Sequence, residues 1–304
     1  MSIFKIASKD QSFLRIVLHG CPGAGKTWTA LTMAHYLERL YGYQPGSIVL
    51  ADTERSSAAK YAGEVYNEDG DKFHFQTVSD EFFQGNYSEK KFNTLLAECQ
   101  KEKVPILIID SMSHFWNGEG GIMSAVDNEA QKMKNPNSFV AWKAGDSIYR
   151  RMVQNLTTYK GHIITTLRAK MAYEQKTNDK GYKELQRLGM APEMRDHFVS
   201  ELDVEGMIDE DHKLRVGKTR CNAVDGKVFP RPGLEFTKLL YDWATSGTKA
   251  RDVFTEIKAD ATSVKTKEDV ENFLGKIKNN KIFLSDVELD ELRNLYTQLS
   301  ATVK

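Results

Sequence analysis

The chain contains 304 residues, with 40% hydrophobic and 28% charged side chains and 42 basic residues against 42 acidic ones. This composition is typical of a soluble globular protein, and a net charge of zero predicts no partner by itself. The three cysteines form no CxxC pair, which argues against a disulfide framework or a zinc site. No segment approaches the roughly 18 apolar residues of a membrane span, and the N-terminal segment has no signal-peptide pattern. We therefore expect a cytoplasmic protein that does not bind a membrane.

Short apolar runs alternate with longer helical patterns along the first half of the chain. This alternation is typical of an α/β protein with a mainly parallel sheet flanked by helices. The run at 104–110 is the most apolar, as expected of a central strand covered on both faces. The predicted strands are 13–20, 47–52, 73–78, 104–110 and 161–167, and the predicted helices are 26–41, a segment near 90–100, and 139–159.

The pattern changes after Arg168. Residues 170–195 predict a long polar loop, and 197–208 and 212–220 predict two strands that pair antiparallel across an acidic turn. A helix that ends near Trp243 closes a large domain, which we place at 1–246. Residues 247–304 show three amphipathic patterns, the last introduced by a capping box from Ser285 to Glu288, and predict a small helical domain.

The strongest motif is GCPGAGKT, Gly20 to Thr27, which matches GxxxxGK[ST] and lies between a predicted strand and a predicted helix. Glycines let such a loop point its N–H groups at phosphate oxygens, and the helix N-terminus adds a positive field. Lys26 then contacts the β- and γ-phosphates, and the Thr27 hydroxyl is a Mg²⁺ ligand. We therefore predict ATP and Mg²⁺ as ligands and hydrolysis to ADP and phosphate. The predicted nucleotide contacts in this segment are Gly20, Pro22, Gly23, Ala24, Gly25, Lys26, Thr27 and Trp28.

Two acidic residues extend this site. Asp110 ends the most apolar strand, where a carboxylate meets the Mg²⁺ shell of a P-loop protein, although such an Asp elsewhere is commonly a turn residue. Glu54 follows a second short strand, where its carboxylate can polarise a water molecule that attacks the γ-phosphate. Composition alone does not separate that role from a surface acid in a turn.

The order of these parts resembles the core of the RecA family, in which a P-loop strand precedes a strand that ends in Asp-x-Glu and then the Walker B strand. Here these are GCPGAGKT, Asp52-Thr-Glu54 and Asp110. The resemblance implies that Glu54 is the catalytic base and that Thr166 senses the γ-phosphate. It also implies a homo-oligomer, ring or filament, in which Lys218 and Arg220 reach the nucleotide of a neighbouring subunit. The alternative for this pair is two basic residues on an exposed strand.

More narrowly, TLRAKMAYE, LGMAPEMRD, KTRC and KVFPRPG resemble segments of phage-encoded RecA-like ATPases associated with single-strand annealing and recombination. The resemblance covers about residues 10–245. It implies single-stranded DNA as a partner, in the cytoplasm of a bacterial host. For the helices of 249–304 two roles stay open, docking on a single-strand-binding protein or covering the core. Two other functions stay open: a helicase-type or loader motor, and a nucleotide-gated DNA-binding module with slow hydrolysis.

In such a core, DNA binds to the loops after the Walker B strand and after the next strand, here about 112–146 and 170–195. Between Lys160 and Arg195 the sequence has eight basic residues and four acidic ones, with tyrosines interleaved. Basic groups neutralise phosphates and aromatic rings stack on unpaired bases, whereas the plain alternative is a solvated loop. The candidate DNA contacts are Lys170, Tyr173, Lys176, Lys180, Lys183, Arg187 and Arg195.

Overall fold

The computed structural model describes residues 9–54, 57–133, 138–177, 183–195, 197–247, 253–280, 284 and 286–302. The chain divides into two compact units. The larger unit is Ser12–Ser246, and the smaller one combines Gly247–Lys304 with Met1–Gln11.

The larger unit is built on one sheet, with nine strands among the described residues. They are β1 Arg15–Gly20, β2 Ile48–Asp52, β3 Gln76–Thr77, β4 Ile106–Asp110, β5 His162–Thr177, β6 Lys183–Pro192, β7 Val204–Ile208, β8 Lys213–Thr219 and β9 Val228–Pro230. The order is β3-β2-β4-β5-β1-β7-β8-β9, with β6 beside β5. All pairs from β3 to β7 in this order are parallel, and β8 and β9 add an antiparallel edge. The predicted mainly parallel α/β fold is confirmed.

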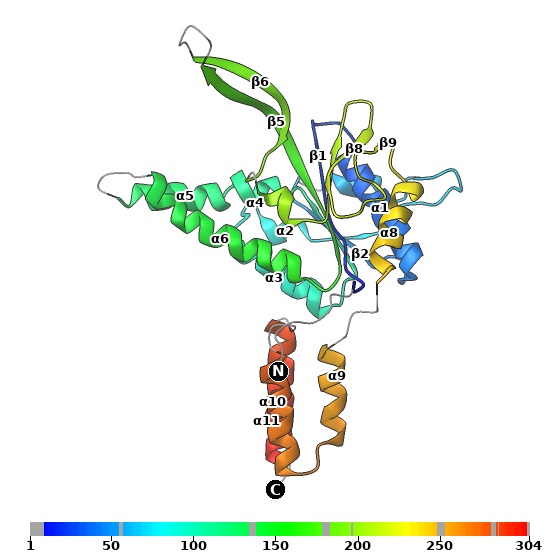
Figure 1. Cartoon of the computed structure of the whole chain (residues 1–304), viewed down its shortest axis with the longest axis vertical. Coiled ribbons are helices and arrows are strands. Elements are labelled where there is room, and N and C mark those ends of the chain that lie inside the picture. Colours follow the sequence, from blue (N-terminus) through cyan, green and yellow to red (C-terminus); the bar gives the residue numbers. More distant parts are fainter. Residues whose placement is uncertain are drawn as a thin grey trace. The chain divides into compact units, whose positions relative to one another are not determined.

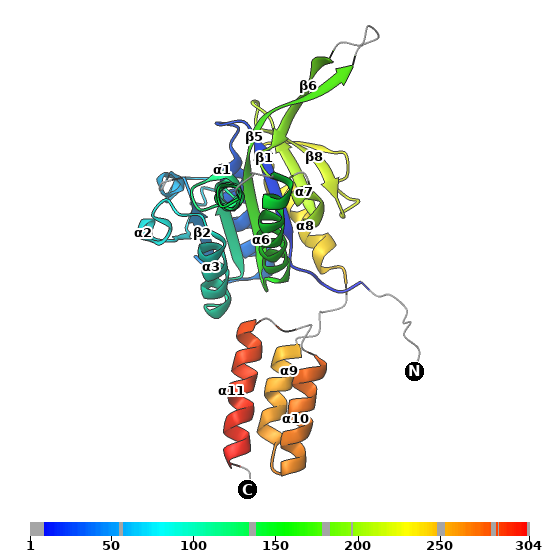
Figure 2. The same ribbon diagram turned by 90° about the vertical axis from the view of Figure 1, so that its left-hand side faces the viewer.

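Helices cover both faces of the sheet (Figures 1 and 2). On one face α1 (Lys26–Tyr41) and α8 (Leu234–Thr245) pack against Ile16 and Leu18 of β1. On the other face α3 (Glu89–Lys101) and α6 (Ser138–Thr158) pack in the cluster that contains Val17. Because successive residues of a strand face opposite sides, the continuous apolar run of β1 buries both faces at once.

The prediction of a loop between the Walker B strand and the long helix is wrong for its described part. The segment forms α4 (Ser113–Asn117) and α5 (Ile122–Gln131), whose buried Phe115, Ile122 and Val126 pack inward. Three shorter helices are α2 (Asp80–Phe83), α7 (Phe198–Glu201) and η1 (Ala58–Tyr61). Of the strand predicted over 73–78, only Gln76–Thr77 form a strand, β3.

The prediction of a polar loop over 170–195 is also wrong. β5 continues past the sheet to Thr177 and pairs antiparallel with β6, so the two strands form a ribbon that projects from the core (Figures 1 and 2). Pairing satisfies the backbone N–H and C=O groups of both strands, whatever the polarity of their side chains. We call residues 169–192 the ribbon; residues 178–182 between its strands lie outside the described residues.

The smaller unit contains α9 (Val253–Asp260), η2 (Ala261–Ser263), α10 (Lys267–Asn279) and α11 (Asp286–Thr302). The apolar stripes of these helices form a core of their own around Phe273 and Leu292. Thr266 and Asp269 form a capping box at the start of α10. The capping box predicted at Ser285 falls on a residue outside the described ones. No helix among the described residues is long and apolar enough to cross a membrane.

Candidate functional site

The P-loop joins β1 to α1 at the carboxyl edge of the sheet. Gly23 and Gly25 have φ values of 82° and 90°, a left-handed conformation that favours glycine. The loop therefore curls around the first turn of α1, whose N–H groups are free of helical partners there. The Lys26 ammonium donates hydrogen bonds to the carbonyl oxygens of Gly20 (3.1 Å) and Cys21 (2.9 Å). The other predicted contacts in this loop and helical turn are Pro22, Ala24, Thr27 and Trp28.

Asp110 lies at the end of β4, and β5 separates it from the P-loop strand. Its carboxylate nevertheless accepts a hydrogen bond from Thr27 Oγ1 on one oxygen, at 2.5 Å, and from Thr166 Oγ1 on the other. The three predicted residues are therefore in direct contact. Hydroxyl and carboxylate oxygens are hard donors of the kind Mg²⁺ prefers, so Thr27 and Asp110 fit this ion. The Asp110–Ser111 peptide bond is cis.

Burial changes the proton affinity of the charged groups at this edge. Desolvation lowers the pKa of Lys26, opposed by the nearby carboxylates of Asp110 and Glu54. Desolvation also raises the pKa of Asp110, which is 2% exposed, opposed by the hydrogen bonds from Thr166 and Thr27. A cation supplied next to Asp110 would offset that cost, which is consistent with a binding site for Mg²⁺ and phosphate.

The two carboxylates of the Asp-x-Glu segment at the end of β2, Asp52 and Glu54, make different contacts. The Asp52 carboxylate accepts hydrogen bonds from the backbone N–H groups of Glu54 (2.6 Å) and Ala58 (2.8 Å), so it fixes the turn. The Glu54 side chain is about one-third exposed. Because Asp52 is occupied by two backbone groups, Glu54 is the better placed of the two to act as a base.

Arg168, which the motifs did not single out, is the direct partner of Glu54. Its Nη2 and Nε lie 2.9 Å and 3.0 Å from Glu54 Oε1. The charge of Glu54 raises the pKa of Lys26 and the charge of Arg168 lowers it, so the three groups lie at one site. A cavity of about 850 Å³ opens beside the pair and is lined by His114, Tyr87 and other residues. The one feature of the sequence that could have placed Arg168 at this site is its position two residues after Thr166.

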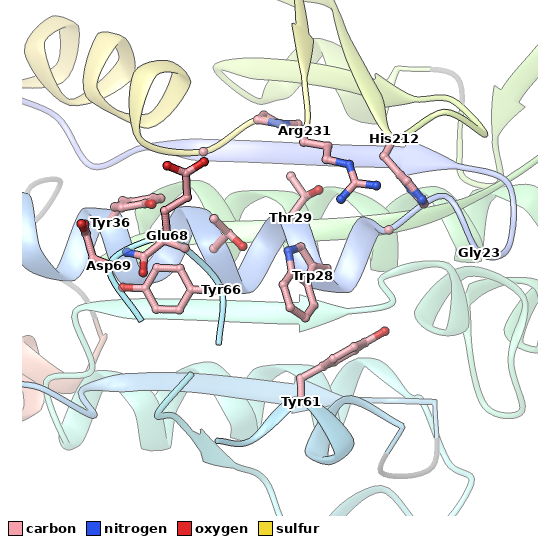
Figure 3. A pocket seen from close by; sticks show the side chains of 15 residues that line it. Gly23, Trp28, Thr29, Tyr36, Tyr61, Tyr66, Glu68, Asp69, His212 and Arg231 are labelled. Atoms are coloured by element: carbon pink, nitrogen blue, oxygen red, sulfur yellow. The ribbon is translucent and has the colours of Figure 1, made fainter. Parts of the chain in front are cut away.

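A second cavity, of about 750 Å³, begins at the P-loop and follows α1 (Figure 3). Trp28 and Tyr61 line it with rings 5.7 Å apart in an edge-to-face arrangement, and His212 and Arg231 line it from the β8–β9 side. Aromatic faces, an imidazole and a guanidinium group beside a phosphate loop suit the base and ribose of a nucleotide. Of these four side chains, only Trp28 was predicted as a nucleotide contact, since the other three come from distant segments.

Lys218 and Arg220 lie at the opposite edge of the sheet from their own P-loop. Thr219 of β8 lies opposite Val204 at the start of β7, whereas Gly20 of the P-loop lies beside Ile208 at the end of β7. Val204 and Ile208 are four residues apart, which corresponds to roughly 13 Å along the strand. The Lys218 ammonium donates to the Leu202 carbonyl, and Arg220 Nη1 pairs with Asp203 Oδ1 at 2.8 Å. Within one chain, the pair therefore does not approach the nucleotide site.

A family model described as an AAA domain matches residues 12–227. That range begins before β1 and ends after β8, so it contains the P-loop, Asp110 and the ribbon. The chain belongs to the AAA domain family. No curated protein matches it. As an AAA domain protein it is a nucleotide-hydrolysing P-loop ATPase, and ATPases of this kind bind their nucleotide with Mg²⁺.

The candidate DNA contacts of this AAA domain protein are spread along the ribbon. Lys170 is exposed on β5. Arg195, after the ribbon, pairs with Asp146 and lies 5.0 Å from the ring centroid of Tyr149, so it is engaged with α6. For four candidates the structure describes the backbone only, within β5 and β6: Tyr173, Lys176, Lys183 and Arg187. Lys180 lies outside the described residues.

Proposed function

We propose that this AAA domain ATPase binds single-stranded DNA and remodels it in recombination or annealing, and that it is phage-encoded. The observation that carries the proposal is the ribbon, which leaves the sheet at the same edge as the P-loop, Asp110 and Glu54. The two strands of the ribbon carry basic residues at 170, 176, 183 and 187, which suit a phosphate backbone, and its root touches the hydrolytic site. DNA on the ribbon is therefore in a position to change the rate of ATP hydrolysis.

The chemistry follows from the residues at that edge. A water oxygen forms the new bond to the γ-phosphorus, the bond to the bridging oxygen of ADP breaks, and Glu54 accepts the water's proton. Lys26 turns from the P-loop carbonyls toward the β- and γ-phosphates, and Thr166 donates to a γ-phosphate oxygen. Thr27 and Asp110 would hold Mg²⁺, and the ion would supply neutralisation of phosphate charge.

We further propose that the enzyme acts as a homo-oligomer, ring or filament, in which Lys218 and Arg220 stabilise charge on the nucleotide of the neighbouring subunit. Their position at the far edge of the sheet supports this, because it keeps them away from their own nucleotide site. To reach a neighbouring nucleotide, Lys218 would have to leave the Leu202 carbonyl and Arg220 would have to leave Asp203. A cation at the transferring phosphoryl group is worth several orders of magnitude in rate in other P-loop enzymes.

The test is the ATPase rate with and without single-stranded DNA, run beside sizing of the protein with ATP and Mg²⁺. The proposal predicts an assembly larger than a monomer and a rate that rises at least about threefold with DNA. Slow turnover with no response to DNA would contradict it and favour a nucleotide-gated binding module. Directional movement along the strand would favour a helicase-type or loader motor instead.

A further inference from the structure

The ion pair between Arg168 and Glu54 restrains the proposed base. Two guanidinium nitrogens lie within 3.0 Å of one carboxylate oxygen, so this is a charge-assisted contact with two donors. Because both donors bind the same oxygen, Oε1, the contact fixes the orientation of the Glu54 carboxylate. The side chains are 44% and 33% exposed, so other ions or a movement of Arg168 can separate them.

Arg168 is also the residue at which the ribbon leaves the sheet. Its N–H donates to the Ser113 hydroxyl (3.0 Å), which in turn donates to the carbonyl of Glu193 (2.9 Å), at the end of the returning strand. The Glu193 N–H donates to the Arg168 carbonyl (2.6 Å). Ser113 therefore ties both strands of the ribbon to the segment that follows Asp110, and the side chain of Arg168 continues from this junction to Glu54.

We propose that Arg168 is a positioning residue that holds Glu54 inactive until the ribbon is loaded. A load on the ribbon shifts its root, Arg168 withdraws, and Glu54 turns to the attacking water. The inference rests on the proposed function, because it takes Glu54 as the base and single-stranded DNA as the load. It adds a named contact through which DNA and hydrolysis are coupled.

The experiment measures kcat and KM for ATP, with and without a single-stranded oligonucleotide, in the wild type and in Arg168→Gln. Without DNA we expect kcat of the variant to rise at least about threefold, with KM within twofold, and DNA to add little more. Arg168→Lys keeps a positively charged donor group, so its kcat without DNA should lie between those of the wild type and Arg168→Gln. Combining Arg168→Gln with Glu54→Gln should give a protein as inactive as Glu54→Gln alone, which would show that the gain requires Glu54.

Arg151→Gln is the matched control. Arg151 makes an exposed two-donor ion pair with Glu89 (2.5 Å and 2.7 Å) on the helices that cover the sheet, away from the site. We expect it to leave kcat and the response to DNA unchanged. A fall or no change in the kcat of Arg168→Gln would overturn the proposal, and so would a full response to DNA in that variant. If DNA fails to stimulate the wild type, the proposed function fails, whereas a raised basal rate in Arg168→Gln would still support the restraint on Glu54.

Discussion

Thr27 and Asp110 share a hydrogen bond of 2.5 Å although they follow strands that are not neighbours. β5 lies between β1 and β4, and its Thr166 occupies the second oxygen of the same carboxylate. Both contacts exist because parallel strands end at one edge of the sheet. The oxygen atoms needed for Mg²⁺ are thus assembled by the fold, beside the ammonium of Lys26.

Lys26→Ala should reduce ATP hydrolysis by at least about a hundredfold, because it removes the cation next to the β- and γ-phosphates. Steady-state phosphate release measures the effect, with thermal unfolding as a check on the fold. Lys60→Ala, at an exposed lysine on η1, serves as the control. A Lys26→Ala rate within about tenfold of the wild type would contradict the P-loop assignment.

Glu54→Gln should bind ATP with wild-type affinity and fail to turn it over, since an amide does not accept the proton of the attacking water. Asp52→Asn should behave differently, because Asp52 fixes the turn through two backbone N–H groups, and its loss should lower thermal stability. Nucleotide binding and single-turnover hydrolysis separate the two effects. Normal turnover by Glu54→Gln would place the base elsewhere.

The pH dependence of stability should depend on His162. This side chain is fully buried, accepts a hydrogen bond from the Leu14 N–H at Nδ1, and has a pKa lowered to about 3 by burial, with a further contribution from Arg15. Its neutral form is favoured in the folded state, so stability is fully present above its unfolded pKa of about 6.5 and is lost as the pH falls toward 3.

The measurement is the free energy of unfolding of the wild type and His162→Gln at pH 7 and pH 5. Between these values the wild type should lose about 2 kcal/mol more than the variant, because 1.5 pH units below 6.5 correspond to about that much free energy. Equal losses in both proteins would show that His162 does not titrate in the unfolded chain as expected.

The candidate site could be predicted from the sequence where its residues are close together along the chain. Gly20 to Thr27 form one continuous motif, and Asp110 follows a strand that is apolar throughout, so both could be placed without the fold. Arg168 was missed as a partner of Glu54 because the two residues are 114 positions apart and meet only through the strand order. The same holds for Tyr61, His212 and Arg231 in the cavity along α1.

The ribbon was mistaken for a loop for a physical reason. Alternating polar and apolar residues mark a strand when one of its faces is buried in a core. The ribbon lies beyond the sheet, and its described residues Lys170 and Met190 are both exposed, so that alternation is weak. Its polar sequence was therefore typical of a loop, although the backbone pairs over most of its length.

Arg220→Ala should lower turnover about a hundredfold or more while ATP still binds, because a cation from the next subunit acts on the transferring phosphoryl group. Mixing gives the sharper test. Arg220→Ala and Lys26→Ala proteins are each expected to be inactive, yet mixed assemblies contain some interfaces with an intact P-loop and an intact Arg220. Activity should return on mixing. Continued inactivity of co-assembled variants would mean that the pair acts within its own chain or has no role in hydrolysis.

The most direct test of the whole account compares the full chain with a variant in which a short Gly-Ser turn replaces residues 171–190. The replacement keeps Arg168 and Glu193 at the root of the ribbon and removes the part that projects from the core. ATP turnover is measured in both proteins with and without single-stranded DNA. The account predicts that DNA stimulates the full chain at least about threefold and leaves the variant, which still hydrolyses ATP, unchanged. Equal stimulation of both proteins would contradict it.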